Sequence, residues 1–265
     1  MHCINPWSVA VEWTYSVAGL VVGFIVGLTG VGGGSLMTPL LVLGFGVQPA
    51  VAVGTDLLYA SITKAGGAWV HGRRGNVDWG IAGWLAAGSI PAALLTLGVL
   101  RWAKTGLEGL SPVITTTLGI ALILTAFSVL FKERLAAIAR RRNATRAPSG
   151  PAATIAVGAV IGALVTLSSV GAGAVGAAAL LFLYPGVAAS RIVGTDIVHA
   201  VPLALVAGLG HATLGTVDYG VLGWLLLGSL PGIFLGSHFA GSLPNSIVKG
   251  ALAGVLALVG AKLVL

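Results

Sequence analysis

Charged residues are scarce in this chain: they make up 8% of its 265 residues, whereas 57% are hydrophobic. A soluble domain typically carries about 25% charged residues, so this composition excludes an ordinary soluble protein. The mean hydropathy of +1.02 points the same way. Because about 20 residues make one spanning helix, the chain has room for roughly eight to ten helical segments and for little else. The sequence predicts a multi-span membrane protein.

Cysteine and the common catalytic signatures are also missing. The single cysteine, Cys3, excludes an internal disulfide and a cysteine-based metal site, so neither a metal nor a redox cofactor is expected. No Walker A, HExxH or GxSxG pattern is present, which removes support for ATP-driven pumping and for metallo- or serine hydrolysis. We therefore expect a protein that is not an enzyme and needs no cofactor.

The alternation of apolar and polar residues that marks a membrane β-barrel is absent. Stretches such as 114–131 are apolar on nearly every side, which favours helices. The first 13 residues lack a basic region, so we do not interpret them as a cleavable signal peptide. The predicted class is all-α.

Positive charge is concentrated in the middle of the chain, where the segment 132–150 holds Lys132, Arg134, Arg140, Arg141, Arg142 and Arg146. Cytoplasmic loops of membrane proteins collect Lys and Arg, so we assign the net charge of +7 to orientation in a cell inner membrane and not to nucleic-acid binding. The expected partners are the lipid bilayer and a small solute.

Apolar runs divide the chain into two similar halves around this loop, 1–131 and 151–265. Each half is predicted to contain five helical segments, at 9–28, 35–46, 49–70, 78–100 and 110–131, and then at 152–169, 174–185, 188–210, 218–237 and 247–265. An odd number of crossings would make the halves inverted repeats. The loop 71–76 carries two arginines and its counterpart 211–216 carries none, as expected if they face opposite sides.

The second segment of each half is too short for an ordinary span and follows a glycine cluster. Short, interrupted helices at corresponding positions of two halves indicate a transporter binding site. Glycines leave backbone N–H groups open to an anion, and neighbouring hydroxyls add donors; close helix packing is the alternative role for these glycines. The candidate binding residues here are Thr29, Gly32, Gly33, Gly34, Ser35, Ser169, Gly171 and Gly173.

A duplicated motif supplies the remaining candidates. Gly54-Thr55-Asp56 recurs as Gly194-Thr195-Asp196, and fifteen of the 38 positions from 54 to 91 are identical at the same offset of 140. An ionised aspartate inside an apolar run is costly and is functional by default, although it can also cap a broken helix. The candidates are Thr55, Asp56, Tyr59, Arg191, Thr195, Asp196 and His199.

Four duplicated or basic positions, Arg191 among them, have further interpretations. His71 and His211 lie at the far ends of their helices and are expected to be interfacial anchors. Lys64 and Arg191 are not repeated, and either one could neutralise an anion or extend toward an interface.

Together these motifs resemble the sulfite exporter TauE/SafE family over essentially the whole chain. The resemblance rests on Thr29 to Gly34, on the repeated Gly-Thr-Asp, on Gly75-Asn76-Val77-Asp78-Trp79 and on the basic central loop. The second glycine cluster departs from the pattern, as Gly171-Ala172-Gly173. The resemblance implies an inner-membrane secondary transporter that exports small sulfur-containing anions such as sulfite, sulfoacetate or other organosulfonates.

Three functions follow as hypotheses. The first is a secondary transporter that works by alternating access, with an anion as substrate and protons as a candidate coupling ion. The second is an intramembrane aspartyl protease, which needs the carboxylates of Asp56 and Asp196 within hydrogen-bond reach. The third is a passive anion channel.

Overall fold

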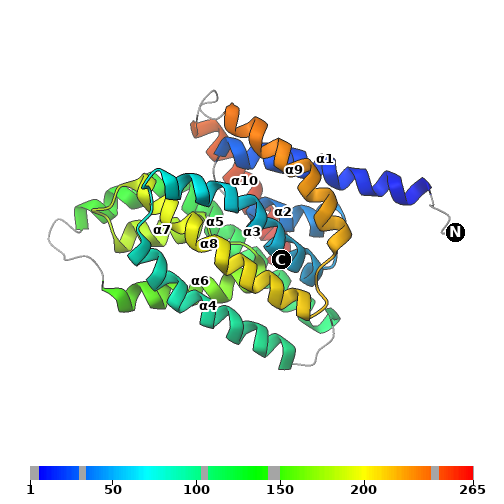
Figure 1. Cartoon of the computed structure of the whole chain (residues 1–265), viewed down its shortest axis with the longest axis horizontal. Helices are drawn as coiled ribbons and strands as arrows, with labels where there is room; N and C mark the ends of the chain where they lie inside the picture. Colours follow the sequence, from blue (N-terminus) through cyan, green and yellow to red (C-terminus); the bar gives the residue numbers. More distant parts are fainter. Residues whose placement is uncertain (1–5, 30–33, 103–106, 143–149, 240–244, 265) are drawn as a thin grey trace.

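The computed structural model describes residues 6–29, 34–102, 107–142, 150–239 and 245–264. Within these ranges the chain is helical and contains no strand, which confirms the predicted all-α class (Figure 1). The first half holds α1 (Pro6–Thr29), α2 (Gly34–Pro39) with the π-helical turn η1 (Leu40–Gly44), α3 (Pro49–Arg73), α4 (Trp79–Trp102) and α5 (Leu107–Arg142). The second holds α6 (Pro151–Ser168), α7 (Ala174–Leu183), α8 (Ala189–Thr213), α9 (Tyr219–His238) and α10 (Asn245–Val264).

The predicted basic loop 132–150 is helical in its first part. Helix α5 runs on to Arg142, because Lys, Glu, Arg, Leu and Ala, which fill most of 132–142, are good helix formers. Residues 143–149 lie outside the described ranges. The helix thus extends well past its apolar part.

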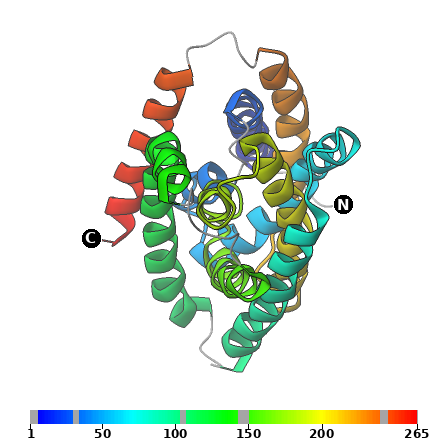
Figure 2. The same cartoon turned by 90° about the vertical axis from the view of Figure 1, so that its left-hand side faces the viewer.

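In the part of the chain that the structure describes, five helices are long and apolar enough to cross a membrane: α4, the part Ser111–Phe131 of α5, α6, α8 and α9. Helices α2 and α7 have only 6 and 10 residues, as the glycine clusters predicted. Both short helices lie in the middle of the molecule (Figure 2). Longer helices surround them.

The long helices pack as pairs that join the two halves: α1 with α9, α4 with α6, and α3 with α8, while α5 packs with α10. Glycines allow the backbones to touch in two of these pairs. Gly23 in α1 faces the backbone of Ser229, and Gly162 in α6 faces the backbone of Ser89, which occupies the equivalent position of the other half. The same kind of contact therefore occurs twice with the halves exchanged.

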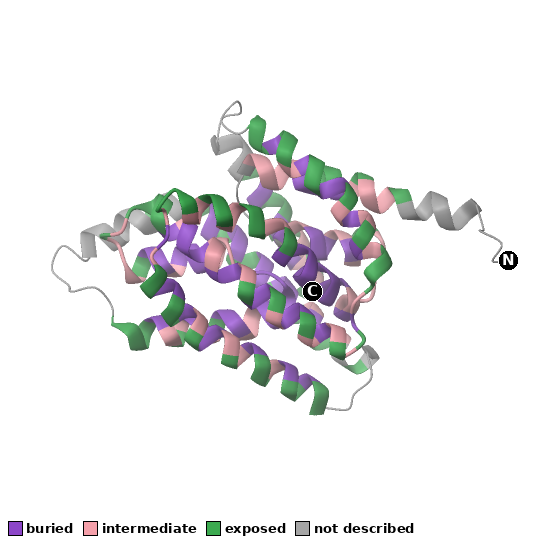
Figure 3. Ribbon diagram, in the orientation of Figure 1, coloured by how far each residue is buried: buried purple, intermediate pink, exposed green. Residues whose placement is uncertain are grey.

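Helices α3 and α8 form the buried centre (Figure 3) and run antiparallel. Gly54 at the start of α3 packs against His211 at the end of α8, Leu58 packs against Gly208, and Gly67 packs against Ile197. The N-terminal part of each helix therefore meets the C-terminal part of the other. Pro202 lies inside α8, where neighbouring helices allow a proline to be tolerated.

Candidate functional site

The duplicated Gly-Thr step forms a clasp between the two halves. Thr55 Oγ1 accepts a hydrogen bond of 3.0 Å from the backbone N–H of Asp218, and Thr195 Oγ1 accepts one of 2.8 Å from the backbone N–H of Asp78. A side chain at Gly54 or Gly194 would collide with the backbone of the same loops. The structure thus places both predicted binding threonines in contacts that hold the halves together.

The two duplicated histidines have different surroundings. His211 is 1% exposed, and its ring nitrogens lie 2.8 Å from Thr216 Oγ1 and 2.9 Å from the carbonyl oxygen of Thr166. The prediction of an interfacial anchor is therefore wrong for His211, which is a buried part of the clasp. His71 is half-buried and packs with Nδ1 against Gly194.

Asp56 is fully buried at the point where α3 meets the short helix α2. The Thr38 hydroxyl of α2 donates a hydrogen bond to Asp56 Oδ2. The hydroxyl of Ser169 faces the same carboxylate, yet Oδ1 makes no hydrogen bond of normal geometry within the part of the chain that the structure describes. The carboxylate keeps one oxygen with capacity for a proton or a further donor.

Ser169 reaches Asp56 because of an unusual backbone. It ends α6 in the left-handed region with φ of 58°, and Gly171 and Gly173 follow with φ of 122° and 132°. Side chains rarely adopt this region, and such strained residues cluster at functional sites. We call residues 169–173 the glycine turn. It brings the second glycine cluster of the chain to α3 of the first half.

Asp196 occupies the equivalent place on α8 and packs against the short helix α7. Its carboxylate lies against Gly176 so closely that an added methyl group would overlap it. Each aspartate therefore packs against the short helix of its own half. This arrangement explains why an apolar chain repeats both an acid and a short helix.

Lys64 links the two aspartates, and the sequence-based candidates did not include it. Its Nζ donates a hydrogen bond of 2.9 Å to the carbonyl oxygen of Ala172 in the glycine turn, and both Asp56 and Asp196 act on it electrostatically. The sequence indicated only that Lys64 or Arg191 could neutralise an anion or extend toward an interface, and Arg191 alone was included among the candidates. A lysine inside an apolar run was nevertheless a visible signal.

A second pair of polar contacts also repeats with the halves exchanged. His199 Nε2 in α8 lies 2.7 Å from the hydroxyl of Ser89 in α4. At the equivalent positions, the hydroxyl of Tyr59 in α3 faces Ser229 in α9. All four side chains are buried. The predicted residues Tyr59 and His199 thus lie in the polar centre, and the sequence-based candidates missed their serine partners.

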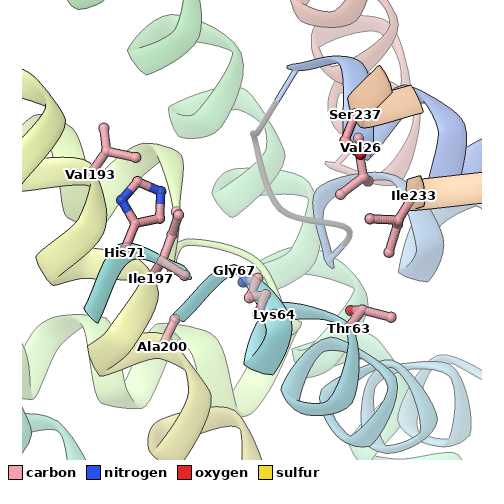
Figure 4. Close-up of a pocket in the computed structure, with 12 residues that line it drawn as sticks. Val26, Thr63, Lys64, Gly67, His71, Val193, Ile197, Ala200, Ile233 and Ser237 are labelled. Carbon is pink, nitrogen blue, oxygen red and sulfur yellow. The ribbon is translucent and has the colours of Figure 1, made fainter. Parts of the chain in front are cut away.

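A cavity of about 300 Å³ opens between α1, α3, α8 and α9, with Lys64 in its wall (Figure 4). We call it the Lys64 cavity. Its polar lining is formed by Thr63, Lys64, His71 and Ser237. Gly27, Gly67 and Gly173 contribute backbone, and the other lining side chains are apolar: Val26, Val193, Ile197, Ala200 and Ile233.

The remaining predicted residues lie at varied distances from this centre. Arg191 is half-exposed and forms an ion pair of 3.5 Å with Asp78, so it is not part of the cavity wall. Ser35 is buried in α2, which Gly34 begins. Gly32, Gly33 and the side chain of Thr29 lie outside the described residues.

The structure does not give the two aspartates the geometry of a protease dyad. In the antiparallel register of α3 and α8, Gly67 pairs with Ile197, which places Asp196 near residue 68 of α3. Asp56 is therefore some three turns of helix away, on the order of 15–20 Å. A shared proton needs direct contact between carboxylates. The aspartyl protease hypothesis fails on this geometry.

Apolar helices around a buried charged centre are the features of a helical membrane protein. A family model described as "Sulfite exporter TauE/SafE" matches residues 15–263, and the chain therefore belongs to that family of membrane transporters. It is a multi-pass membrane transporter, in keeping with an inner-membrane location.

Two relatives from Bacillus subtilis (strain 168) are similar over nearly their full length. The probable membrane transporter protein YjnA is 40% identical over 248 residues, covering 93% of this chain and 97% of the relative. The probable membrane transporter protein YdhB is 28% identical over 240 residues, covering 88% and 91%. No solved structure matches the chain significantly.

Proposed function

We propose that this protein is a secondary transporter that exports small sulfur-containing anions, such as sulfite, sulfoacetate or other organosulfonates, by alternating access. The observation that carries the proposal is the position of a cation, Lys64, in the wall of a cavity. An aspartate from each half, Asp56 and Asp196, interacts with it electrostatically. The family description supplies the sulfur chemistry.

A cation in this position favours an anionic substrate. An ammonium group in a water-poor site attracts an anion more strongly than it does in bulk water, because the local dielectric constant is lower. Among the described residues that line the cavity, Lys64 is the only Lys or Arg. An anion that enters the cavity would therefore meet its ammonium group first.

Alternating access is supported by the way the halves meet. Helices α3 and α8 cross in antiparallel fashion at the centre, and the pairs α1 with α9 and α4 with α6 repeat with the halves exchanged. Two equivalent halves around a central site allow one half to rock against the other, opening the site to either side in turn. The inverted-repeat arrangement predicted from the sequence belongs to this proposal.

Proton coupling follows from the charge balance. With Lys64 protonated and both Asp56 and Asp196 ionised, the centre carries one surplus negative charge, and a bound anion would add another. Binding of a proton by one of the aspartates would remove that repulsion. His199 also interacts with Lys64 and is a further titratable group of the centre. Protons and the anion are thus expected to move together.

Flux measurements in proteoliposomes test this function. The panel consists of sulfite, thiosulfate, sulfoacetate, taurine, sulfate and acetate, each with and without an imposed pH gradient. Saturable flux of sulfite or a sulfonate that is accelerated by the gradient, together with counterflow of labelled substrate, is the expected result. Flux without saturation or counterflow would instead identify a passive channel. No flux of any sulfur anion through folded protein would contradict the proposed substrate.

A further inference from the structure

We propose that Lys64 is the residue that anchors the transported anion and that the cavity selects anions with a short apolar chain over compact inorganic oxyanions. This proposal rests on the proposed function and narrows it to a substrate class and a single binding residue. The sequence had offered Lys64 only as one of two cations that could neutralise an anion, and it predicted no apolar wall. Three observations carry the proposal: the position of Lys64, the absence of a second Lys or Arg among the described lining residues, and the apolar lining.

A hydrogen bond holds the side chain of Lys64 at the edge of the cavity. Its Nζ is hydrogen-bonded at 2.9 Å to the carbonyl oxygen of Ala172, and the adjacent Gly173 also lines the cavity. An ammonium group has three donors, and this bond uses one of them. Because the equivalent position of the second half holds Ala204, the molecule has a single anchor of this kind. One anion per chain is the expected stoichiometry.

Among the described residues of the cavity wall, the two hydroxyls are already engaged in hydrogen bonds, and the ring of His71 is the remaining polar group besides Lys64. The hydroxyl of Thr63 donates to the carbonyl oxygen of Tyr59 at 2.9 Å, and the hydroxyl of Ser237 donates to that of Phe234 at 2.8 Å. Sulfate carries two negative charges and sulfite carries up to two, whereas an alkanesulfonate carries one. A charge that is buried without a partner is costly. The single ammonium group of Lys64 therefore balances the charge of a sulfonate but not that of a dianion.

The rest of the wall suits a hydrocarbon. Val26 of α1, Ile197 of α8 and Ile233 of α9 face the cavity, and Figure 4 shows Val26 and Ile233 across from Lys64. A volume of about 300 Å³ is at the lower end of the range for small-ligand sites. A head group bound by Lys64 would leave space for a few methylene groups. Each buried methylene should strengthen binding about fourfold.

The test is equilibrium binding of unbranched alkanesulfonates to the purified full-length protein. Binding is measured by calorimetry or by tryptophan fluorescence. The series runs from methane- to pentanesulfonate, with alkyl carboxylates of the same length, sulfite and sulfate alongside. Affinity should rise about three- to fourfold per methylene up to three or four carbons and then level off. Sulfate should bind more weakly than ethanesulfonate. Affinity that is independent of chain length would overturn the selectivity.

Substitution of Lys64 tests the anchor. Lys64→Met should weaken binding of every member by at least about tenfold, because it removes a charged hydrogen-bond donor. Lys64→Arg should retain part of the affinity. The control is Lys262→Met, which removes an exposed lysine of α10 that does not line the cavity. Binding by Lys64→Met within twofold of the unmodified protein would overturn the anchor.

A wall substitution keeps the proposal testable if the Lys64 variants fail to fold. Ile233→Thr should reduce the gain per methylene while leaving affinity for methanesulfonate unchanged. An undiminished gain would contradict the apolar wall. The proposed function fails separately: flux of sulfite without any chain-length preference rejects the inference alone, whereas Lys64-dependent binding of carboxylates without flux of any sulfur anion rejects the sulfur substrate alone.

Discussion

At the scale of single residues, the two buried aspartates have unequal surroundings although their sequence context is repeated. Asp56 meets hydroxyls, from Thr38 on α2 and from Ser169 in the glycine turn, and the carboxylate of Asp196 packs against α7 at Gly176. The position equivalent to Thr38 in the second half holds Ala178, so the two halves have diverged at the centre while keeping the clasp threonines identical. We expect both aspartates to contribute to transport.

Replacement of each aspartate by asparagine tests their role in proton coupling. Asp56→Asn and Asp196→Asn should each lower gradient-driven flux at least about tenfold and flatten its pH dependence, because an amide cannot exchange a proton in this range. Flux is measured in proteoliposomes between pH 5.5 and 8. Asp218→Asn is the matched control, because this exposed acid caps α9 and asparagine caps equally well. Full, pH-dependent flux in both buried variants would remove the aspartates from the mechanism.

Gly176 tests whether close packing holds Asp196 in position. Gly176→Ala should lower the melting temperature and transport together, because its methyl group would displace the carboxylate of Asp196. Gly223→Ala in α9 is the control, since a methyl group there meets nothing within 4 Å. Fluorescence-detected thermal unfolding in detergent provides the comparison. Equal stability of both variants would show that α7 does not constrain Asp196.

At the scale of elements, the helices follow from the sequence, whereas their contacts do not. Apolar runs bounded by glycine, proline and charge predicted nearly every helix, because a bilayer dictates both length and composition. Helix α5 was the exception, since its basic extension has no apolar pattern and forms by helix propensity. The partners of Thr55 and Thr195 were unpredictable, because each lies on the other half of the chain, more than 100 residues away.

Because Thr55 and Thr195 hold the two halves together, replacing them should change the stability of the protein and not its affinity for the substrate. Thr195→Val should destabilise the protein by about 1–2 kcal/mol, because the backbone N–H of Asp78 loses its acceptor, while the KM for the transported anion stays the same. Thr55→Val should behave in the same way through Asp218. Thermal unfolding and transport kinetics are measured on the same preparations. A large rise in KM with unchanged stability would return these threonines to the binding site.

At the scale of the whole molecule, the contacts that repeat with the two halves exchanged predict on which side of the membrane each loop lies. If the halves are inverted, Arg74 after α3 and Leu214 after α8 lie on opposite sides of the membrane, with the arginine on the cytoplasmic side. Cys3 is the only cysteine, so a background with Cys3→Ser allows site-specific labelling. Arg74→Cys should be protected from an impermeant maleimide in intact cells, and Leu214→Cys should be labelled. Labelling of both or of neither would contradict inversion.

The same scale explains why Lys64 escaped a search based on repeats. Duplication identifies what both halves need in order to pack, and the clasp meets that need on both sides of the molecule. A transporter with one central substrate site needs only one anchor, so the decisive residue is the one that breaks the repeat. The sequence left open whether Lys64 neutralises an anion or extends toward an interface, and the fold places it in the wall of the cavity.

Anion-driven proton movement tests the central claim most directly. Proteoliposomes containing a pH-sensitive dye are loaded with a transported sulfonate and diluted into sulfonate-free buffer. Efflux should carry protons outward and raise the internal pH, and the change should vanish in Asp56→Asn and Lys64→Met vesicles. Sulfonate efflux at full rate with no change of internal pH, accompanied by a membrane potential, would contradict proton-coupled anion transport.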